Sequence, residues 1–116
     1  MTETLIVERP HAGVIVLTLN RPKQLNALND VMRRELTEAL ASVADDASVN
    51  AVVLTGAARG FCSGIDMRNF GPGVPDAGDP AIDRLRFQEA MAALPQAIWN
   101  LPQPVVAAVN GPCVGG

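Results

Sequence analysis

Two stretches of the sequence share one arrangement, in which a short apolar run rich in β-branched residues leads directly into a glycine-rich loop. The first runs from Ala51 to Leu54 and leads through Thr55-Gly56 into residues 58–67. The second runs from Val105 to Val109 and leads into residues 110–116. Short apolar runs of this kind are typical of strands buried in a sheet, and loops at strand ends often carry sites. The repeated pattern therefore predicts buried strands followed by two loops that can hold a ligand.

Glycines at positions 56, 60 and 64 give the first loop unusual conformational freedom. They allow sharp turns, positive φ angles and a close approach to a ligand. We expect Ser63 and Asp66 to cap a helix that begins near Met67. The Gly- and Pro-rich residues 70–80 are expected to form a surface loop or a loop that orders over a ligand.

The segments before the first loop predict a hairpin and a helix, which make the fold class α/β. Thr4–Glu8 and Val14–Leu19 are predicted to be antiparallel strands connected by residues 9–13. Asn29 is a suitable N-cap for a helix that should end near residues 45–46. The apolar residues of this helix recur every three or four positions, at Met32, Leu36, Leu40 and Val43.

A second helix is predicted from about Ala81. Pro95 lies within it and is expected to kink or split it, because proline lacks a backbone N–H. The helix has an apolar face that we expect to be buried, made by Phe87, Met91, Leu94 and Ile98.

Composition excludes several classes of protein. The 116 residues are enough for one domain, and 48% of them are apolar, which is sufficient for a core. A net charge of −3 and the absence of Tyr argue against a nucleic-acid partner. No run is long enough for a signal sequence or a membrane span, so we expect a cytoplasmic protein without a membrane partner. Cys62 and Cys113 have neither zinc-site nor disulfide-framework spacing, so we expect no metal and two reduced, small apolar side chains.

The glycine loops fit neither of the two common phosphate-binding patterns, because their glycine intervals differ and no lysine follows. Nucleophilic catalysis by Cys62 or Ser63 is disfavoured because His11, in a predicted turn, is the single histidine and no G-x-S-x-G elbow is present. Backbone N–H groups on the two loops could instead converge on one oxygen atom, as in an oxyanion hole. Residues 20–28 carry two positive charges and are either a solvated connection or a surface that meets an anionic ligand.

Three blocks of the sequence, in order, resemble the N-terminal signatures of the crotonase, or enoyl-CoA hydratase/isomerase, family. The blocks are Asn20-Arg21-Pro22-Lys23 with Leu25-Asn26-Ala27-Leu28, Val53-Leu54-Thr55-Gly56 with Phe61-Cys62-Ser63-Gly64-Ile65-Asp66, and residues 104–111 with Gly115-Gly116. The resemblance covers essentially the whole chain. It implies a crotonase/ClpP-like spiral of ββα units, of which residues 1–116 would be a partial domain, its N-terminal part.

The resemblance also implies an activity and a set of site residues. Family members bind acyl-CoA thioesters, assemble as trimers or dimers of trimers, and hold an enolate with two backbone N–H groups. Carried over by motif, these donors would be Ser63 and Gly116, and Asp66 would be mainly structural. Coenzyme A would be part of the substrate, with no separate cofactor, and would be bordered by Lys23, Gln24, Leu25, Ala27, Cys62, Ser63, Gly64, Ile65, Asp66 and Met67.

Two departures from the family pattern bear on function. Ile65 stands where the family often has a small residue, and the family's catalytic glutamates follow the second glycine loop, where these 116 residues hold no counterpart. The expected parent reaction is reversible hydration of a 2-enoyl-CoA, with isomerase, hydrolase and decarboxylase relatives left open. The alternative is a non-catalytic fragment that binds CoA or oligomerises.

Overall fold

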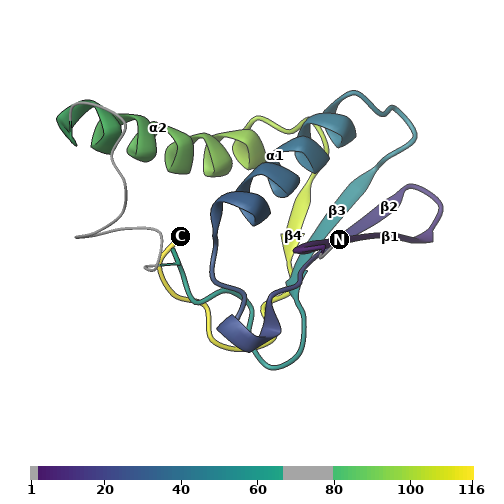
Figure 1. The fold of residues 1–116 in the computed structure, drawn as a ribbon. Helices are drawn as coiled ribbons and strands as arrows, with labels where there is room; N and C mark the ends of the chain where they lie inside the picture. The colour runs from purple at the N-terminus through teal and green to yellow at the C-terminus, as the bar shows by residue number, and fades with distance from the viewer. Residues whose placement is uncertain (1–2, 67–79) are drawn as a thin grey trace.

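Residues 3–66 and 80–116 are described by a computed structural model of the chain. Their strands and α-helices, in chain order, are β1 (Leu5–His11), β2 (Val14–Leu19), α1 (Asp30–Ala44), β3 (Ala51–Gly56), α2 (Pro80–Trp99) and β4 (Val105–Ala107). The strands form one sheet in the order β1-β2-β3-β4, and α1 and α2 lie on the same face of it (Figure 1). The predicted loop at residues 70–80 and the helix start near Met67 fall outside the described residues, except for Pro80, which begins α2.

The first two strands form the predicted antiparallel hairpin, in which Leu5 lies opposite Leu19. β1 continues past Glu8 to His11 through a register shift, so the connection is shorter than predicted. Pro10 is tolerated in the strand because β1 is an outer strand of the sheet, where the missing N–H breaks no ladder on the outer side.

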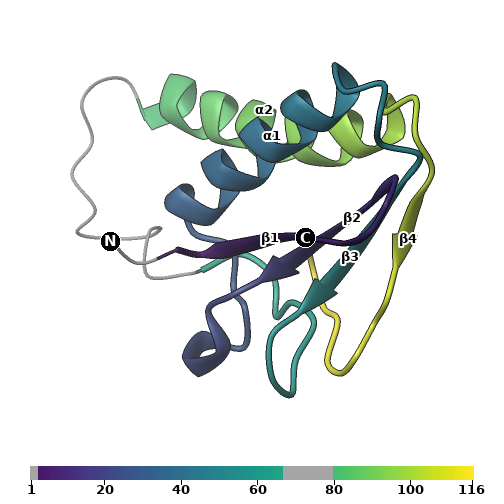
Figure 2. The ribbon, with the colours of Figure 1, turned by 90° about the vertical axis from the view of Figure 1, so that its right-hand side faces the viewer.

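The other strands pair in parallel. β3 runs beside β2 from Val14↔Ala51 to Leu19↔Gly56, and β4 runs beside β3. Parallel neighbours need a crossover connection, which α1 supplies between β2 and β3 and α2 supplies between β3 and β4. The carboxyl ends of β2, β3 and β4 therefore share one edge of the sheet (Figure 2). The two glycine loops follow these carboxyl ends.

Helix α1 is confirmed as predicted. The Asn29 side-chain Oδ1 accepts a hydrogen bond from the Met32 N–H at 2.9 Å, which satisfies one of the unpaired donors at the helix start. Its four apolar positions are all buried and form a core with Leu17 and Val52 of the sheet. This packing holds the segment before α1, residues 20–29, against the end of the sheet.

Helix α2 runs without interruption past Pro95, so the proline does not split it. Of its predicted apolar face, Leu94 is buried, whereas Phe87, Met91 and Ile98 are half-buried. No described helix combines the length and the apolar character that a membrane crossing requires.

The prediction of a buried strand over residues 105–109 is wrong for the described part of the chain. β4 ends at Ala107, and the Val106 side chain is 57% exposed. The reason is its position: β4 is the outer strand of the sheet, and its far edge pairs with no described strand. An apolar run indicates that a strand is suited to burial but does not identify what covers it.

Candidate active site

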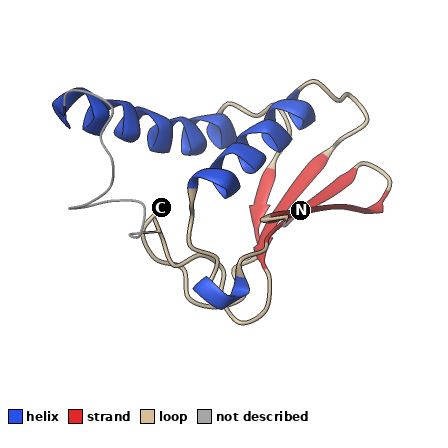
Figure 3. Ribbon diagram, viewed as in Figure 1, coloured by secondary structure: helices blue, strands red, loops and turns tan. Residues whose placement is uncertain are grey.

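Three loops meet at the carboxyl ends of the parallel strands. They are residues 20–28 after β2, residues 57–66 after β3, and residues 108–116 after β4 (Figure 3). Loop 57–66 lies between the other two and bonds to both. Because the strands are parallel, these loops lie at the same end of the sheet, and their backbone groups can contact one ligand.

Loops 57–66 and 108–116 run side by side through a short parallel bridge between Cys62 and Cys113. The Cys62 N–H donates to the Pro112 carbonyl oxygen at 3.1 Å, and the Val114 N–H donates to the Cys62 carbonyl oxygen at 2.9 Å. The two glycine loops, which are far apart in sequence, are therefore fixed to each other by main-chain hydrogen bonds.

Beyond this bridge the loops come into backbone contact at two glycines. Gly64 has φ +100° and Gly115 has φ +66°, a region that L side chains rarely adopt. A Cβ on Gly64 would lie 3.0 Å from the Val114 carbonyl oxygen, and one on Gly115 would lie 3.3 Å from the Gly64 Cα. Glycine is required at both positions for the loops to approach this closely.

The hydrogen bonding of Ser63 argues against its predicted role as a donor to substrate. The Ser63 N–H donates to the Leu25 carbonyl oxygen at 3.0 Å, and its hydroxyl donates to the Gln24 carbonyl oxygen at 3.2 Å. An amide that already has an internal acceptor is not available to a substrate oxygen. Ser63 instead attaches loop 57–66 to loop 20–28.

The Ile65 amide lies on the same loop, next to the contact between the loops, and remains available as a donor. It forms a parallel bridge with Leu28, in which the Leu28 N–H donates to Gly64 O and the Asp66 N–H donates to Leu28 O. This pattern uses the Gly64 carbonyl oxygen and the Asp66 N–H, and the Ile65 N–H between them makes no hydrogen bond within residues 3–66 and 80–116. The Gly116 N–H is likewise unbonded within those ranges.

The Ile65 and Gly116 amides occupy equivalent places on the two loops. Each follows a positive-φ glycine at the contact between the loops: Ile65 follows Gly64, and Gly116 follows Gly115. Sequence reasoning named Ile65 only as a residue bordering CoA and not as a donor, because a side-chain pattern does not reveal which way an N–H points. The repeat of a glycine immediately before each donor is the signal that could have indicated it.

The residues predicted to border CoA are distributed over two of the loops. Lys23 and Gln24 are exposed in a short 3-10 helix, Pro22–Gln24, and Leu25 follows it with φ 48°. Ala27, Cys62 and Gly64 are buried, so their side chains or Cα atoms face the protein interior. Met67 lies outside the described residues. Contact of this set with CoA stays a prediction.

Asp66 forms a buried ion pair with Arg21, whose Nη2 lies 2.9 Å from Oδ2. The two side chains are 11% and 7% exposed, and Arg21 also donates to the Ala27 carbonyl oxygen. A charge buried to this degree is costly unless it is paired. The pairing links loop 20–28 to the end of loop 57–66, which agrees with a structural role for Asp66.

Both cysteines are free thiols. Burial raises the pKa of the Cys62 thiol. A hydrogen bond from the Gly64 backbone lowers this pKa by a smaller amount, and the nearby Cys113 has the smallest effect, which raises it. A neutral, buried thiol is unreactive, as expected for a packing residue. Cys113 is exposed, so the prediction of a buried apolar side chain is wrong there.

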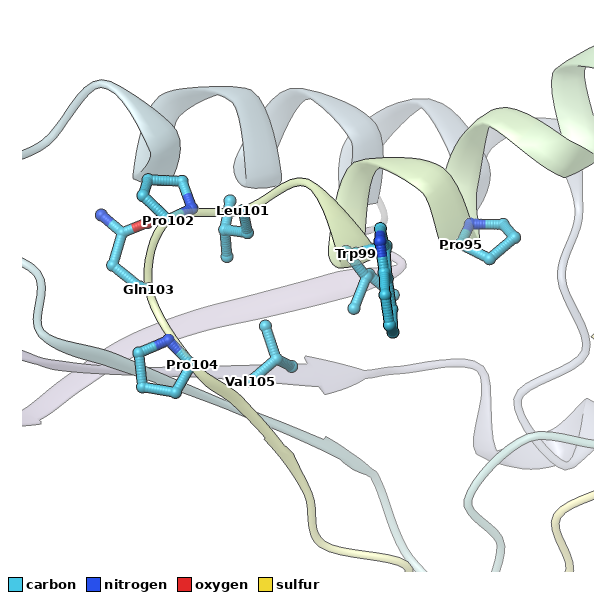
Figure 4. A pocket seen from close by; sticks show the side chains of 8 residues that line it. Pro95, Trp99, Leu101, Pro102, Gln103, Pro104 and Val105 are labelled. Carbon is cyan, nitrogen blue, oxygen red and sulfur yellow. The ribbon is translucent and has the colours of Figure 1, made fainter.

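A pocket of about 520 Å³ lies at the opposite end of β4, between the end of α2 and the start of the strand (Figure 4). It is lined mainly by apolar residues, including Pro95, Trp99, Leu101 and Pro104. Its residues precede β4 or begin it, whereas the second glycine loop follows the strand, so the pocket is separate from the donor site. No cluster of His, Cys, Asp or Glu suited to a metal ion occurs in the described part of the chain.

Comparison with known proteins identifies relatives of the chain. A family model described as enoyl-CoA hydratase/isomerase matches residues 9–116. A probable enoyl-CoA hydratase of Mycobacterium bovis is 43% identical over 114 residues, which cover 97% of this chain and 40% of that protein. The 1,2-epoxyphenylacetyl-CoA isomerase of Escherichia coli is 41% identical over 112 residues, covering 95% of this chain and 41% of the isomerase.

Solved structures give the same result. The crystal structure of an enoyl-CoA hydratase/carnithine racemase from Magnetospirillum magneticum superposes with a TM-score of 0.84 and 33% identity, covering 99% of this chain and 42% of that one. An enoyl-CoA hydratase from Bacillus anthracis gives a TM-score of 0.80 at 29% identity, covering 94% and 40%. The predicted resemblance and fold class are confirmed. The chain spans about two fifths of the length of these relatives.

Proposed function

Because the chain belongs to the enoyl-CoA hydratase/isomerase family, we propose that it supplies the enolate-binding part of an enzyme that acts on acyl-CoA thioesters. The observation that carries this proposal is the contact of the two loops at Gly64 and Gly115, directly before the Ile65 and Gly116 amides, which have no hydrogen-bond partner among residues 3–66 and 80–116. The thioester oxygen would accept from both amides. In this proposal Ile65 replaces Ser63 as the first donor.

The two donors act on charge that develops during the reaction. In the hydration of a 2-enoyl-CoA, the oxygen of water bonds to C3 while a general base removes one of its protons. The C2=C3 π bond breaks, its electron pair is delocalised onto the thioester oxygen, and an enolate forms. A proton then adds to C2. Fixed N–H groups stabilise the anionic oxygen more than the neutral carbonyl, by about 2.7–4 kcal/mol per donor. The backbone contacts between the loops keep the donors in place before substrate binds.

Proton transfer requires other groups. General acid–base catalysis contributes about 10²–10⁴-fold, and the family resemblance assigns it to glutamates after the second glycine loop. Asp66 is a poor candidate because its carboxylate is paired with Arg21 in the protein interior. We therefore assign Asp66 to positioning loop 57–66.

Isomerisation is a second candidate reaction. The chain is 43% identical to a probable hydratase and 41% identical to a CoA-thioester isomerase, so identity does not separate the two activities. Both reactions can pass through an enolate on the thioester oxygen, and this site would serve either one. The alternative of a non-catalytic CoA-binding or oligomerising fragment predicts binding without turnover.

Substitution at Ile65 tests the donor assignment in the product of the complete reading frame. Ile65→Pro removes the N–H and is expected to lower kcat for crotonyl-CoA hydration by about 10²–10³-fold. Ile65→Val retains the N–H and is the matched control, with kcat close to that of the parent protein. Ser63→Ala should also retain activity, because it keeps the backbone N–H and removes only the hydroxyl contact to the Gln24 carbonyl oxygen.

The outcomes distinguish the candidates. Full activity in Ile65→Pro would refute the donor assignment. Absence of crotonyl-CoA turnover, together with isomerisation of a 3-enoyl-CoA, would favour the isomerase. Tight binding of a CoA thioester with neither reaction would favour the non-catalytic alternative.

We also propose the assembly and location that the resemblance implies, a homotrimer or dimer of trimers in the cytoplasm. Apolar side chains exposed on the described surface, among them Trp99 and Val106, support burial of further surface in an assembly. Light scattering of the purified protein would measure the mass of the assembly, and cell fractionation would test the location.

A further inference from the structure

Asn26 is completely buried, and each of its side-chain polar atoms has a partner. Its Oδ1 accepts a hydrogen bond from the Arg21 N–H at 2.8 Å. Its Nδ2 donates to the carbonyl oxygens of Ala57 at 3.1 Å and Gly60 at 2.8 Å. The residue has φ 57°, a conformation that asparagine adopts more readily than most residues. The side chain therefore joins loop 20–28 to the turn that follows β3.

Asn110 binds the same turn from the opposite loop. Its Nδ2 donates to the carbonyl oxygens of Gly56, Ala58 and Gly60, at 2.9, 3.0 and 3.2 Å. Its Oδ1 accepts from the Gly56 N–H at 3.2 Å. The next residue, Gly111, packs so closely that a Cβ there would lie 1.9 Å from a carbonyl oxygen of the turn. The close packing at Gly111 holds Asn110 against the turn.

Both asparagine amides converge on one atom, the Gly60 carbonyl oxygen. Asn26 reaches it from the loop after β2, and Asn110 reaches it from the loop after β4. Gly60 belongs to loop 57–66, which bonds to both of the other loops. Residues 56–60 are thus held on both sides by side-chain amides, and the Ile65 donor follows on the same loop.

We propose that Asn26 and Asn110 are positioning residues, which fix the distance between the Ile65 and Gly116 amides through their common contact at Gly60. This inference rests on the proposed enolate site. An oxyanion must meet both donors at hydrogen-bond distance, so a displacement of one loop by 1 Å can reduce the rate about 10²-fold. Neither side chain touches the substrate in this assignment.

Asn110 is the better position for a test because it is exposed, whereas Asn26 is buried. In the product of the complete reading frame, Asn110→Ala is expected to lower kcat for crotonyl-CoA about 10–100-fold. The KM should change little, since the residues predicted to border CoA are untouched. Asn100→Ala is the matched control: Asn100 is exposed and directly follows α2, and its side chain makes no hydrogen bond within the described ranges.

A spectroscopic measurement separates positioning from a general loss of structure. Acetoacetyl-CoA ionises to an ultraviolet-absorbing enolate, and a site with two well-placed donors increases the ionised fraction of the bound molecule. Asn110→Ala should bind this thioester with a smaller enolate signal than the parent protein and Asn100→Ala. If Asn110→Ala does not fold, Asn110→Asp keeps the acceptor for Gly56 and removes the three donated bonds, so the same comparison applies.

The results separate this inference from the proposed function. A parent protein without turnover and without enolate formation would overturn both. An active parent with Asn110→Ala equal to Asn100→Ala in kcat and enolate signal would overturn the positioning role alone. A lower stability of Asn110→Ala with an unchanged enolate signal would show that Asn110 is merely structural, which also overturns it.

Discussion

Replacing Asp66 by alanine is expected to destabilise the protein by about 3–5 kcal/mol, the usual cost of removing one partner from a buried ion pair. Asp66 and Arg21 are 7% and 11% exposed and lie 2.9 Å apart, so the substitution leaves a guanidinium charge in the interior. For a urea m-value of about 2 kcal/mol per molar, this cost lowers the unfolding midpoint by about 1.5–2.5 M. The decrease should persist in high salt, because buried charges are screened weakly.

Circular dichroism during urea titration measures the midpoint, and Arg9→Ala is the control. Arg9 pairs with Asp46 at 2.5 Å, but these side chains are 48% and 35% exposed, so its removal should shift the midpoint little. The double variant Arg21→Met/Asp66→Leu leaves no charge unpaired. Its loss of unfolding free energy should therefore be smaller than the sum of the losses measured for the single variants Asp66→Ala and Arg21→Met. A midpoint for Asp66→Ala equal to that of Arg9→Ala would refute the reasoning.

Two further predictions concern the loops. Gly111→Ala should destabilise the protein by about 1–3 kcal/mol or more, because the added Cβ would lie 1.9 Å from the Arg59 carbonyl oxygen. Gly60→Ala, whose Cβ would have its nearest neighbour at 3.4 Å, should cost less in the same urea titration, and equal costs would contradict the steric argument. Iodoacetamide near pH 8 should label the exposed Cys113 well before Cys62, because burial keeps the Cys62 pKa above its usual value and its thiol neutral. Peptide mass spectrometry would measure the order, and equal labelling would show that Cys62 is accessible.

The parts of the fold that the sequence predicted well are those set by local chemistry. The start, end and buried face of α1 follow from Asn29 and from the spacing of four apolar residues, and the structure agrees with each. The hairpin was also predicted, although its first strand is longer because Pro10 can lie on an outer strand. The three motif blocks indicated the family, which the comparisons confirm.

The parts that the sequence predicted poorly depend on what lies next to a segment in space. The exposure of Val106 follows from the position of β4 at the edge of the sheet, which an apolar run does not encode. The choice between Ser63 and Ile65 depends on which amide the Leu25 carbonyl oxygen accepts, a contact across 38 residues of chain in a different loop. Residue type says little about the direction of an N–H. The roles of Asn26 and Asn110 require knowledge of a shared acceptor, Gly60.

The contact between Gly64 and Gly115 has a consequence for how such a site can be studied. Because the loops meet through main-chain atoms, most of the proposed chemistry is carried by groups that every residue possesses. An alanine scan would pass over Ile65 and leave its amide intact, so a survey of side chains would report a position of no importance. Isotopic labelling of the amide nitrogens, followed by nuclear magnetic resonance during titration with a thioester, would observe the donors directly.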